Sequence, residues 1–407
     1  MSMHSRRAAW RPAAAATLTA LALAGCAATP TGMQPVAAPV AGPSGGASTA
    51  ATTTGGDSAS GAGALAGTTQ ARPPITGSDP ITLAFAGDVH FEKDKLRRVA
   101  NDPEGMATLK PYLAAADITV VNLETAITSG GSPLPGKPFT FRAPASALTT
   151  LANAGVDVAG MANNHGADFG AKGLADTLKA QASAPLKVIG VGNNLDEANA
   201  PAEFVIDGVT IAILNVTPLQ EETTDYHTAA DDAPGVAALV KPYTSTAAKR
   251  FVAAVEDAAR RYDVVVVFIH WGTEGERCPT PKQFEVEKML SAAGADAIIG
   301  GHSHRVQAGG WSGNTYVNYG LGSFTWWLVP SDPATGVLTL TLDKDRVAAK
   351  RAAADPDAAA SVFVKESWQA MVIGESGLPY VPGKDTVARL NAKRDSLLLC
   401  SKLSATP

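Results

Sequence analysis

The sequence has three cysteines, few aromatic residues and, beyond its first two dozen residues, no long apolar run. It also lacks a block of basic residues after its first dozen residues, and 33 Lys and Arg against 38 Asp and Glu give a net charge of −5. A nucleic-acid binder needs clustered Lys and Arg, so that class of partner is excluded. A transmembrane helix needs about 20 apolar residues, so no later segment is predicted to cross a bilayer.

What is present suits a globular protein. The 407 residues are enough for two or three domains or for one large α/β domain. Hydrophobic residues make up 45% of the chain and charged residues 17%, which is ample for a buried core. Gly and Pro are not spread evenly, since the first 68 residues, one sixth of the chain, hold 15 of the 66, so the chain is not uniformly globular.

The first 25 residues resemble a secretion signal. A basic segment that ends at Arg11 precedes an Ala/Leu run, Ala13–Ala24, which is too short to span a bilayer. Small residues stand directly before Cys26, as in a bacterial lipobox, where this cysteine would become the lipidated first residue. The alternative is an ordinary signal peptide that is cleaved nearby.

Residues 26–75 are mainly Ala, Thr, Gly, Ser and Pro, with almost no charge and no aromatic residue. Such a segment cannot bury enough apolar surface to offset its ordering entropy, which predicts a flexible tether. We therefore expect an extracytoplasmic protein that is lipid-anchored to the cell membrane. Its folded domain would span residues 76–345, and residues 346–407 would form a C-terminal extension that wraps this domain.

Beyond Pro80, short β-rich runs alternate with helical stretches. The run Val264–Ile269 is apolar at every position, which predicts a strand that is covered on both faces. Glu203–Ile206 and Val209–Val216 predict a hairpin. The other predicted strands are Ile81–Ala86, Asp117–Asn122, Val156–Met161, Lys187–Val191, Asp263–Ile269, Asp296–Gly300, Thr315–Asn318 and Val337–Leu342. The predicted helices are Pro144–Ala154, Lys172–Ala184, Thr246–Arg261 and Pro281–Ala293.

Histidines follow the predicted strands. Of the six histidines beyond the signal segment, only His227 does not stand at a strand end; the other five are His90, His165, His270, His302 and His304. In open α/β sheets, ligands bind in the crevice outside the carboxyl ends of the strands. We therefore expect these imidazoles to converge.

The five histidines are interleaved with Asp88, Glu124 and Asn164. Imidazoles and hard oxygen ligands together are typical of a metal site. Eight such residues are too many for one tetrahedral ion but suit two ions that share a bridging carboxylate at roughly 3.5–4 Å separation. The alternative is a polar network without ions, in which burial of so many polar groups would be costly.

Taken together, the motifs resemble those of the calcineurin-like metallophosphoesterases, and most closely the CapA branch, named for poly-γ-glutamate capsule synthesis. They span about residues 81–342 and are Ala86-Gly87-Asp88-Val89, Val121-Asn122-Leu123-Glu124, Ala162-Asn163-Asn164-His165, His270-Trp271-Gly272-Thr273-Glu274, Gly301-His302-Ser303-His304 and Tyr319-Gly320-Leu321-Gly322-Ser323-Phe324. The resemblance implies an α/β fold, a four-layer αββα sandwich of two mixed sheets flanked by helices.

The resemblance also implies a role for each residue. The site would hold two divalent ions (Mn, Fe, Zn or Mg). The ligands of the first ion would be Asp88, His90 and His304. The ligands of the second would be Asn164, His270 and His302, and Glu124 would bridge the two ions. His165 would be the catalytic residue beside the substrate phosphoryl group. Such a site suits hydrolysis of a phosphoester by metal-activated water.

The chain departs from the wider superfamily at two positions. The bridging residue there is an Asp after Gly, whereas Glu124 follows Leu123 here. The catalytic His there is followed by an Asp that orients it, whereas Gly166 follows His165 here, and Asp168 is a candidate substitute.

We therefore predict a surface-anchored, CapA-like hydrolase in capsule or cell-envelope polymer synthesis. It would act on an anionic polymer or a phosphoester and work beside membrane capsule-synthesis proteins. Two alternatives stay open: a non-catalytic accessory protein that binds anionic polymer or the synthesis machinery, and a metal-dependent γ-glutamyl hydrolase. The full ligand set favours an enzyme, and the lack of an Asp directly after His165 favours the accessory role.

For other residues near the motifs, the sequence is compatible with more than one role. Three candidate substrate contacts are Asn163, Glu274 and Arg305. Four tryptophans either line the cleft or belong to the core: Trp271, Trp311, Trp326 and Trp327. Cys278 and Cys400 remain after Cys26 is set aside, and an even number in an oxidising compartment is compatible with one disulfide, the alternative being two unrelated buried thiols.

Overall fold

The computed structural model describes residues 72–354 and 359–407. The predicted signal peptide, Cys26 and most of the predicted tether lie outside these residues. The chain divides into two compact units, Met1–Ala66 and Gly67–Pro407, and all the elements named below belong to the second. Within the described ranges, no helix has both the length and the apolar character needed to cross a membrane.

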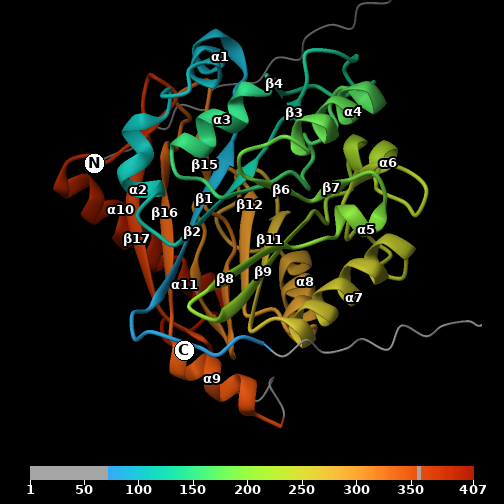
Figure 1. Ribbon diagram of the computed structural model, residues 1–407. Coiled ribbons are helices and arrows are strands. Elements are labelled where there is room, and N and C mark those ends of the chain that lie inside the picture. Colours follow the sequence, from blue (N-terminus) through green and yellow to red (C-terminus); the bar gives the residue numbers. More distant parts are fainter. Residues whose placement is uncertain (1–71, 355–358) are drawn as a thin grey trace, which may run out of the picture. The chain divides into compact units, whose positions relative to one another are not determined.

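Two mixed sheets form the centre of the domain (Figure 1). In spatial order the first contains β18 (Pro379–Tyr380), β17 (Phe363–Ile373), β16 (Ala334–Leu342), β1 (Ile81–Val89), β2 (Ile118–Leu123), β5 (Val158–Gly160) and β6 (Lys187–Ile189), with β15 (Ser323–Thr325) also paired to β1. The second contains β13 (Gly309–Ser312), β14 (Thr315–Asn318), β12 (Ala297–His302), β11 (Val264–Trp271), β9 (Val209–Val216) and β8 (Ala202–Ile206). Strands β1, β2, β5 and β6 are mutually parallel, as are β9, β11, β12 and β14.

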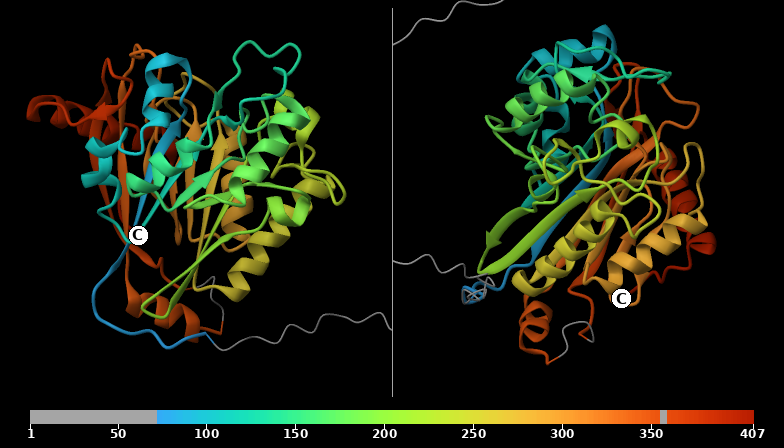
Figure 2. Two further views of the ribbon diagram at one scale, coloured as in Figure 1. Left: turned by 45° about the horizontal axis from the view of Figure 1, so that its top comes forward. Right: turned by 90° about the vertical axis from the view of Figure 1, so that its right-hand side faces the viewer.

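Helices cover the outer face of each sheet. The first sheet is covered by α1 (Lys93–Asn101), α2 (Lys110–Leu113), α3 (Ser146–Asn153) and α4 (Gly170–Gln181), and the second by α7 (Thr246–Arg261) and α8 (Pro281–Ala292). Figure 2 shows the two groups of helices from two further directions. The remaining elements are η1 (Ala107–Leu109), β3 (Ala126–Ile127), β4 (Arg142–Ala143), β7 (Val191–Gly192), α5 (Leu195–Ala198), α6 (Glu222–His227), β10 (Gly235–Val236), α9 (Lys344–Ala352), α10 (Lys384–Ser396) and α11 (Leu398–Ser401).

The side-chain pattern of the strands explains this layering. In β1, Leu83 and Phe85 point into the core between the two sheets, whereas Ala84 and Ala86 pack against the helices of the first face. Strand β11 supplies alternate residues to the core between the sheets and to the core under α7 and α8. Strands buried on both faces are therefore apolar throughout. The αββα sandwich expected from the sequence is confirmed.

The C-terminal part of the chain differs from the extension expected. Residues 363–373 form β17, which pairs antiparallel with β16 along its whole length and is an integral strand of the first sheet. Residues 72–75 are part of the folded domain, whereas the sequence predicted a flexible tether there. Arg72 pairs with the buried Asp263 at 2.8 Å, and Ile75 packs against the core between the sheets. The predicted boundary between tether and domain, after residue 75, therefore lies a few residues too late in the chain.

A disulfide joins Cys278 to Cys400, whose Cα atoms lie 5.8 Å apart, and it closes a separation of 122 residues. In the chain-entropy model, a loop of this size contributes about 4–5 kcal/mol of stability. We expect reduction to lower the melting temperature by roughly 5–10 °C, as measured by calorimetry with and without reductant. The double variant Cys278→Ser/Cys400→Ser should not respond to reductant. An unchanged melting temperature of the reduced parent would mean that packing alone holds the C-terminus.

Candidate metal centre

The strand ends of both sheets meet at one place. Asp88 and Asn122 are register partners at the ends of β1 and β2, and Glu124 follows β2 directly. In the second sheet, β11 and β12 run parallel and carry His270 and His302 at their ends. Parallel strands bring their carboxyl ends to one edge of each sheet, and the packing of the two sheets brings these two edges together.

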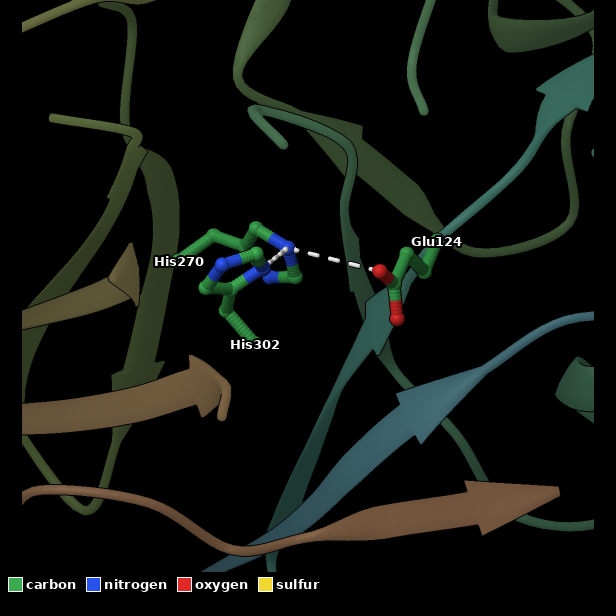
Figure 3. Close-up of side chains that lie close together, drawn as sticks. All are labelled: Glu124, His270 and His302. Carbon is green, nitrogen blue, oxygen red and sulfur yellow. Dashed lines mark hydrogen bonds and ion pairs between the residues drawn. The ribbon is translucent and has the colours of Figure 1, made fainter. Parts of the chain in front are cut away.

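Two groups of three ligands form, and Glu124 belongs to both. Glu124, His270 and His302 each offer an atom within 4.8 Å of the others, and so do Asp88, Glu124 and His304. Glu124 Oε1 lies 3.5 Å from His270 Nε2, which in turn lies 3.2 Å from His302 Nδ1. Figure 3 shows the carboxylate of Glu124 facing the two imidazoles. We refer to these five residues as the ligand cluster.

Two further predicted ligands lie beside the cluster. Asn164 Oδ1 is 2.9 Å from His270 Nε2. His90 accepts a hydrogen bond from the Glu92 backbone at Nδ1, and its Nε2 is buried without any partner. The structure thus brings Asp88 and His304 together in one group and His270 and His302 in the other, with Asn164 next to the second group and His90 outside both groups.

Most of the cluster is buried, and this burial shifts the pKa values of its residues. Both carboxylate oxygens of Glu124 are buried without a hydrogen-bond partner, and burial together with the charge of Asp88 raises its pKa well above its usual value. Burial also lowers the pKa of His270 to about 4, so this imidazole is neutral at pH 7 and can bind a metal. A buried carboxylate without hydrogen bonds is costly, and a divalent cation would offset that cost. The residues present therefore fit divalent metal ions.

His304 has the opposite shift. Burial would lower its pKa, but the carboxylates of Glu124 and Asp88 raise it to about 9. Its Nδ1 lies 3.1 Å from Asp88 Oδ2. Without a cation nearby, a proton on His304 supplies the positive charge that these two carboxylates require. A divalent ion at the same place would displace that proton.

Backbone conformation also marks the cluster. His302 has φ 87° and His304 has φ 51°, in the left-handed region that non-glycine residues rarely adopt. Such conformations cost about 1–3 kcal/mol each and persist where the surrounding structure requires them. Here they turn both imidazoles of the Gly301-His302-Ser303-His304 motif toward the carboxylates.

His165 lies at the edge of the cluster and is oriented by Asp168. His165 Nδ1 is 2.6 Å from Asp168 Oδ2, and His165 Nε2 is 3.8 Å from Glu124 Oε1. The Phe141 backbone N–H donates to the same Asp168 oxygen, and Lys137 pairs with the other at 2.6 Å. The residue that orients this histidine thus stands three positions along the chain.

Lys137 was not predicted from the sequence to be a functional residue. Its ammonium group is buried and also donates to the backbone carbonyl of Asn164 and, at 3.4 Å, to Thr223 Oγ1. It ties the loop between β3 and β4 to the segment that carries Asn164 and His165. The one sequence signal is that this lysine stands in a Gly- and Pro-rich segment without acidic residues.

The three predicted substrate contacts have different surroundings. Asn163 is fully buried, donates to Asn122 Oδ1 and Leu123 O, and accepts from the His165 backbone, so it positions the cluster and cannot reach a substrate. Glu274 is exposed, 3.8 Å from His304 Nε2, and Arg305 donates to the His304 carbonyl at 2.9 Å. Glu274 and Arg305 therefore stay candidate contacts.

The four tryptophans divide between core and cleft. Trp271 and Trp311 are buried and use their indole N–H groups on backbone carbonyls. Trp326 and Trp327 are half-buried, and the Trp326 ring centroid lies 4.4 Å from that of His90 and 4.5 Å from that of His304. Only the second pair borders the metal centre.

The chain is similar to known proteins over the region that holds this centre. The family model described as bacterial capsule synthesis protein PGA_cap matches residues 82–326. The chain is 27% identical over 250 residues to the PGA biosynthesis protein CapA of Bacillus subtilis (strain 168), covering 60% of this chain and 63% of that protein. It is 28% identical over 253 residues to the capsule biosynthesis protein CapA of Bacillus anthracis, covering 61% and 60%. The match thus spans about three fifths of the length of these curated relatives.

A solved structure, the crystal structure of a hypothetical protein from Thermus thermophilus, is 16% identical and has a TM-score of 0.35, covering 74% of this chain and 96% of that one. That score is too low to carry a conclusion. The family match is broader evidence, because residues 82–326 are more than half of the chain and include every residue of the ligand cluster. The chain belongs to the bacterial capsule synthesis protein family PGA_cap.

Proposed function

We propose that this protein is a metal-dependent phosphoesterase that acts outside the cytoplasm in the synthesis of a capsule or of poly-γ-glutamate. The single observation that supports it best is Glu124, a buried carboxylate without hydrogen-bond partners that belongs to both ligand groups. A shared carboxylate between two ligand groups is the arrangement of two-metal hydrolytic sites. The biological setting comes from the relatives, whose names place them in capsule and PGA biosynthesis.

The side chains divide into ion holders and a proton-handling group. Asp88, His90 and His304 would hold one ion, Asn164, His270 and His302 the other, and Glu124 would contact both. When bound, such ions lower the pKa of a water molecule and neutralise charge on a phosphoryl group. The buried Asn122 holds the two halves in place, since its amide donates to Asp88 Oδ1 at 2.9 Å and lies 3.0 Å from His270 Nδ1.

His165 would act on the substrate itself. Asp168 fixes its Nδ1, which leaves Nε2 directed at the cluster. From there Nε2 can hydrogen-bond a phosphoryl oxygen or donate a proton to the leaving oxygen. Lys137 keeps Asp168 in place from the opposite side.

Hydrolysis assays test the proposal directly. The purified protein should hydrolyse p-nitrophenyl phosphate or bis(p-nitrophenyl) phosphate, and chelation should abolish turnover until Mn²⁺ or another divalent ion is restored. Shortening of poly-γ-glutamate without phosphoester turnover would instead favour a γ-glutamyl hydrolase. Tight polymer binding with no turnover of either substrate would favour the accessory role. The contact between His165 and Asp168 removes the main sequence argument for that last alternative.

We also propose that Cys26 anchors the protein to the membrane by a lipid. The variant Cys26→Ser should leave the membrane fraction or stay unprocessed, because no other residue of the lipobox-like segment can be lipidated. Fractionation and the mass of the mature chain measure this. Unchanged fractionation and mass would rule out the lipoprotein.

A further inference from the structure

Two loops at the border of the metal centre expose apolar side chains. Phe139, between β3 and β4, is 58% exposed, and Leu328 and Val329, after β15, are 64% and 49% exposed. The ring centroid of Phe139 lies 6.3 Å from that of Trp327, which directly precedes Leu328. We call Phe139, Trp327, Leu328 and Val329 the apolar rim. Contiguous exposed apolar side chains on a soluble protein mark an interaction site.

The apolar rim adjoins the ligand cluster. Trp326 contacts the rings of both His90 and His304, and its own ring centroid lies 6.2 Å from that of Trp327. Figure 1 shows β15, β4 and α1 in the same part of the molecule. Whatever covers the rim therefore lies against the mouth of the metal centre.

The two segments that supply the rim contain no acidic residues, although the chain as a whole is acidic. The net charge is −5, yet no Asp or Glu occurs between Thr125 and Val156 or between Leu321 and Ser331, the segments that supply the rim. The exposed Lys93 lies with its ammonium group 5.1 Å from the centre of the Trp327 ring. Helix α1, which begins at Lys93, contains four basic residues and one acidic residue. Lys93 thus places a positive charge against the apolar side chains.

We propose that the apolar rim docks on an anionic lipid surface. Phe139, Leu328 and Val329 would enter the boundary between headgroups and acyl chains, and Lys93 would contact the headgroups. Aromatic and aliphatic side chains flanked by lysine are the composition of segments that lie in a membrane interface. Docked in this way, the metal centre faces the bilayer and acts on a phosphoester held at the membrane. That last statement rests on the proposed phosphoesterase function, whereas the docking does not.

Vesicle flotation tests the docking. Residues 67–407 form a compact unit that excludes Cys26, so binding by this unit cannot come from a lipid anchor. We expect it to float with phosphatidylglycerol-containing vesicles, and the triple variant Phe139→Ala/Leu328→Ser/Val329→Ser to partition roughly tenfold less. Lys93→Gln should weaken binding at low salt and have little effect at high salt, where charges are screened.

Val205→Ser is the matched control. Val205 is 64% exposed, like Leu328, but it pairs with Thr210 at the start of β9, and β9 runs parallel to β11, which ends near the metal centre. It therefore lies at the opposite end of the strands, and its variant should float like the parent.

Two results would overturn the docking: the parent unit does not float, or the triple variant floats like the parent. If the parent does not float and the triple variant also loses turnover of a soluble phosphoester, the rim is a substrate subsite instead. Flotation without any hydrolysis would instead contradict the phosphoesterase function and leave the docking standing.

Discussion

Replacing His302 or His270 by Ala is expected to weaken metal binding by about 100-fold and to abolish metal-dependent hydrolysis. Each is a buried imidazole of the group that contains Glu124, and removal of a ligand costs at least as much as removal of a residue that orients one, which is about 10–100-fold. Metal content by mass spectrometry and titration of the apo-protein with Zn²⁺ or Mn²⁺ measure the loss.

His227→Ala is the matched control for both variants. His227 lies at the end of α6, outside the ligand cluster, and is only half-buried, so its removal should change neither metal content nor turnover. Thermal unfolding of each variant shows whether it is folded. Equal metal content in folded His302→Ala, folded His270→Ala and the parent would mean that the cluster does not bind metal.

The variant His165→Ala is expected to keep its metal and to lose turnover by roughly 10²–10⁴-fold, the usual contribution of a positioned general acid or base. His165 Nε2 is 3.8 Å from Glu124 but is absent from both ligand groups, so the ions do not require it. Metal content and kcat of the same preparation separate the two effects. A leaving group of low pKa needs no protonation, so the loss should be smaller for p-nitrophenyl esters than for alkyl esters.

A loss of metal in His165→Ala equal to that in His302→Ala would assign His165 to the ligands instead. A retained metal with unchanged turnover on every ester would remove it from the reaction. Only retained metal with reduced turnover, greater for alkyl esters, fits a residue that handles the proton of the leaving oxygen.

The central features of the fold and the site were predictable because they depend on the pattern of apolar and polar residues within short segments. Val264–Ile269 is apolar throughout, which is typical of a strand covered on both faces. His270 and His302 each stand at the end of an apolar strand, and parallel strands end at one edge of a sheet, so the sequence predicted their convergence and the pairing of β11 with β12 produces it. Helix Thr246–Arg261 has the expected bounds because Ser245 caps it and its apolar residues recur at helical spacing.

Contacts between distant loops were not predictable. Lys137 reaches Asp168 and the Asn164 carbonyl from a segment with no periodicity, and no sequence spacing indicates where such a segment folds. Asp168 is three residues from His165 in a turn, and only the turn's conformation brings its carboxylate to the imidazole. Strand β17 was missed because its exposed face is polar and its alternation is irregular, with Lys365 and Glu366 adjacent.

The tryptophans show the same division. Trp271 and Trp326 both stand near strand ends, and residue type does not distinguish them. The indole N–H of Trp271 donates to the Tyr319 carbonyl, and the ring is buried in the core beneath α8. Trp326 packs against His90 and His304 and stays half-exposed. Tertiary packing decides these positions, and it depends on residues far apart in the chain.

The measurement that tests the central claim most directly is the number of metal ions per chain in the purified protein. Mass spectrometry of the protein after loading with Mn²⁺, Fe²⁺ or Zn²⁺ and removal of excess ion gives this number without any assumption about substrate. The shared position of Glu124 predicts two ions in the parent and the loss of both in Glu124→Gln, because that carboxylate belongs to both ligand groups. A parent that binds no ion, or a folded Glu124→Gln variant that still binds two, would contradict a dinuclear metal centre in this protein.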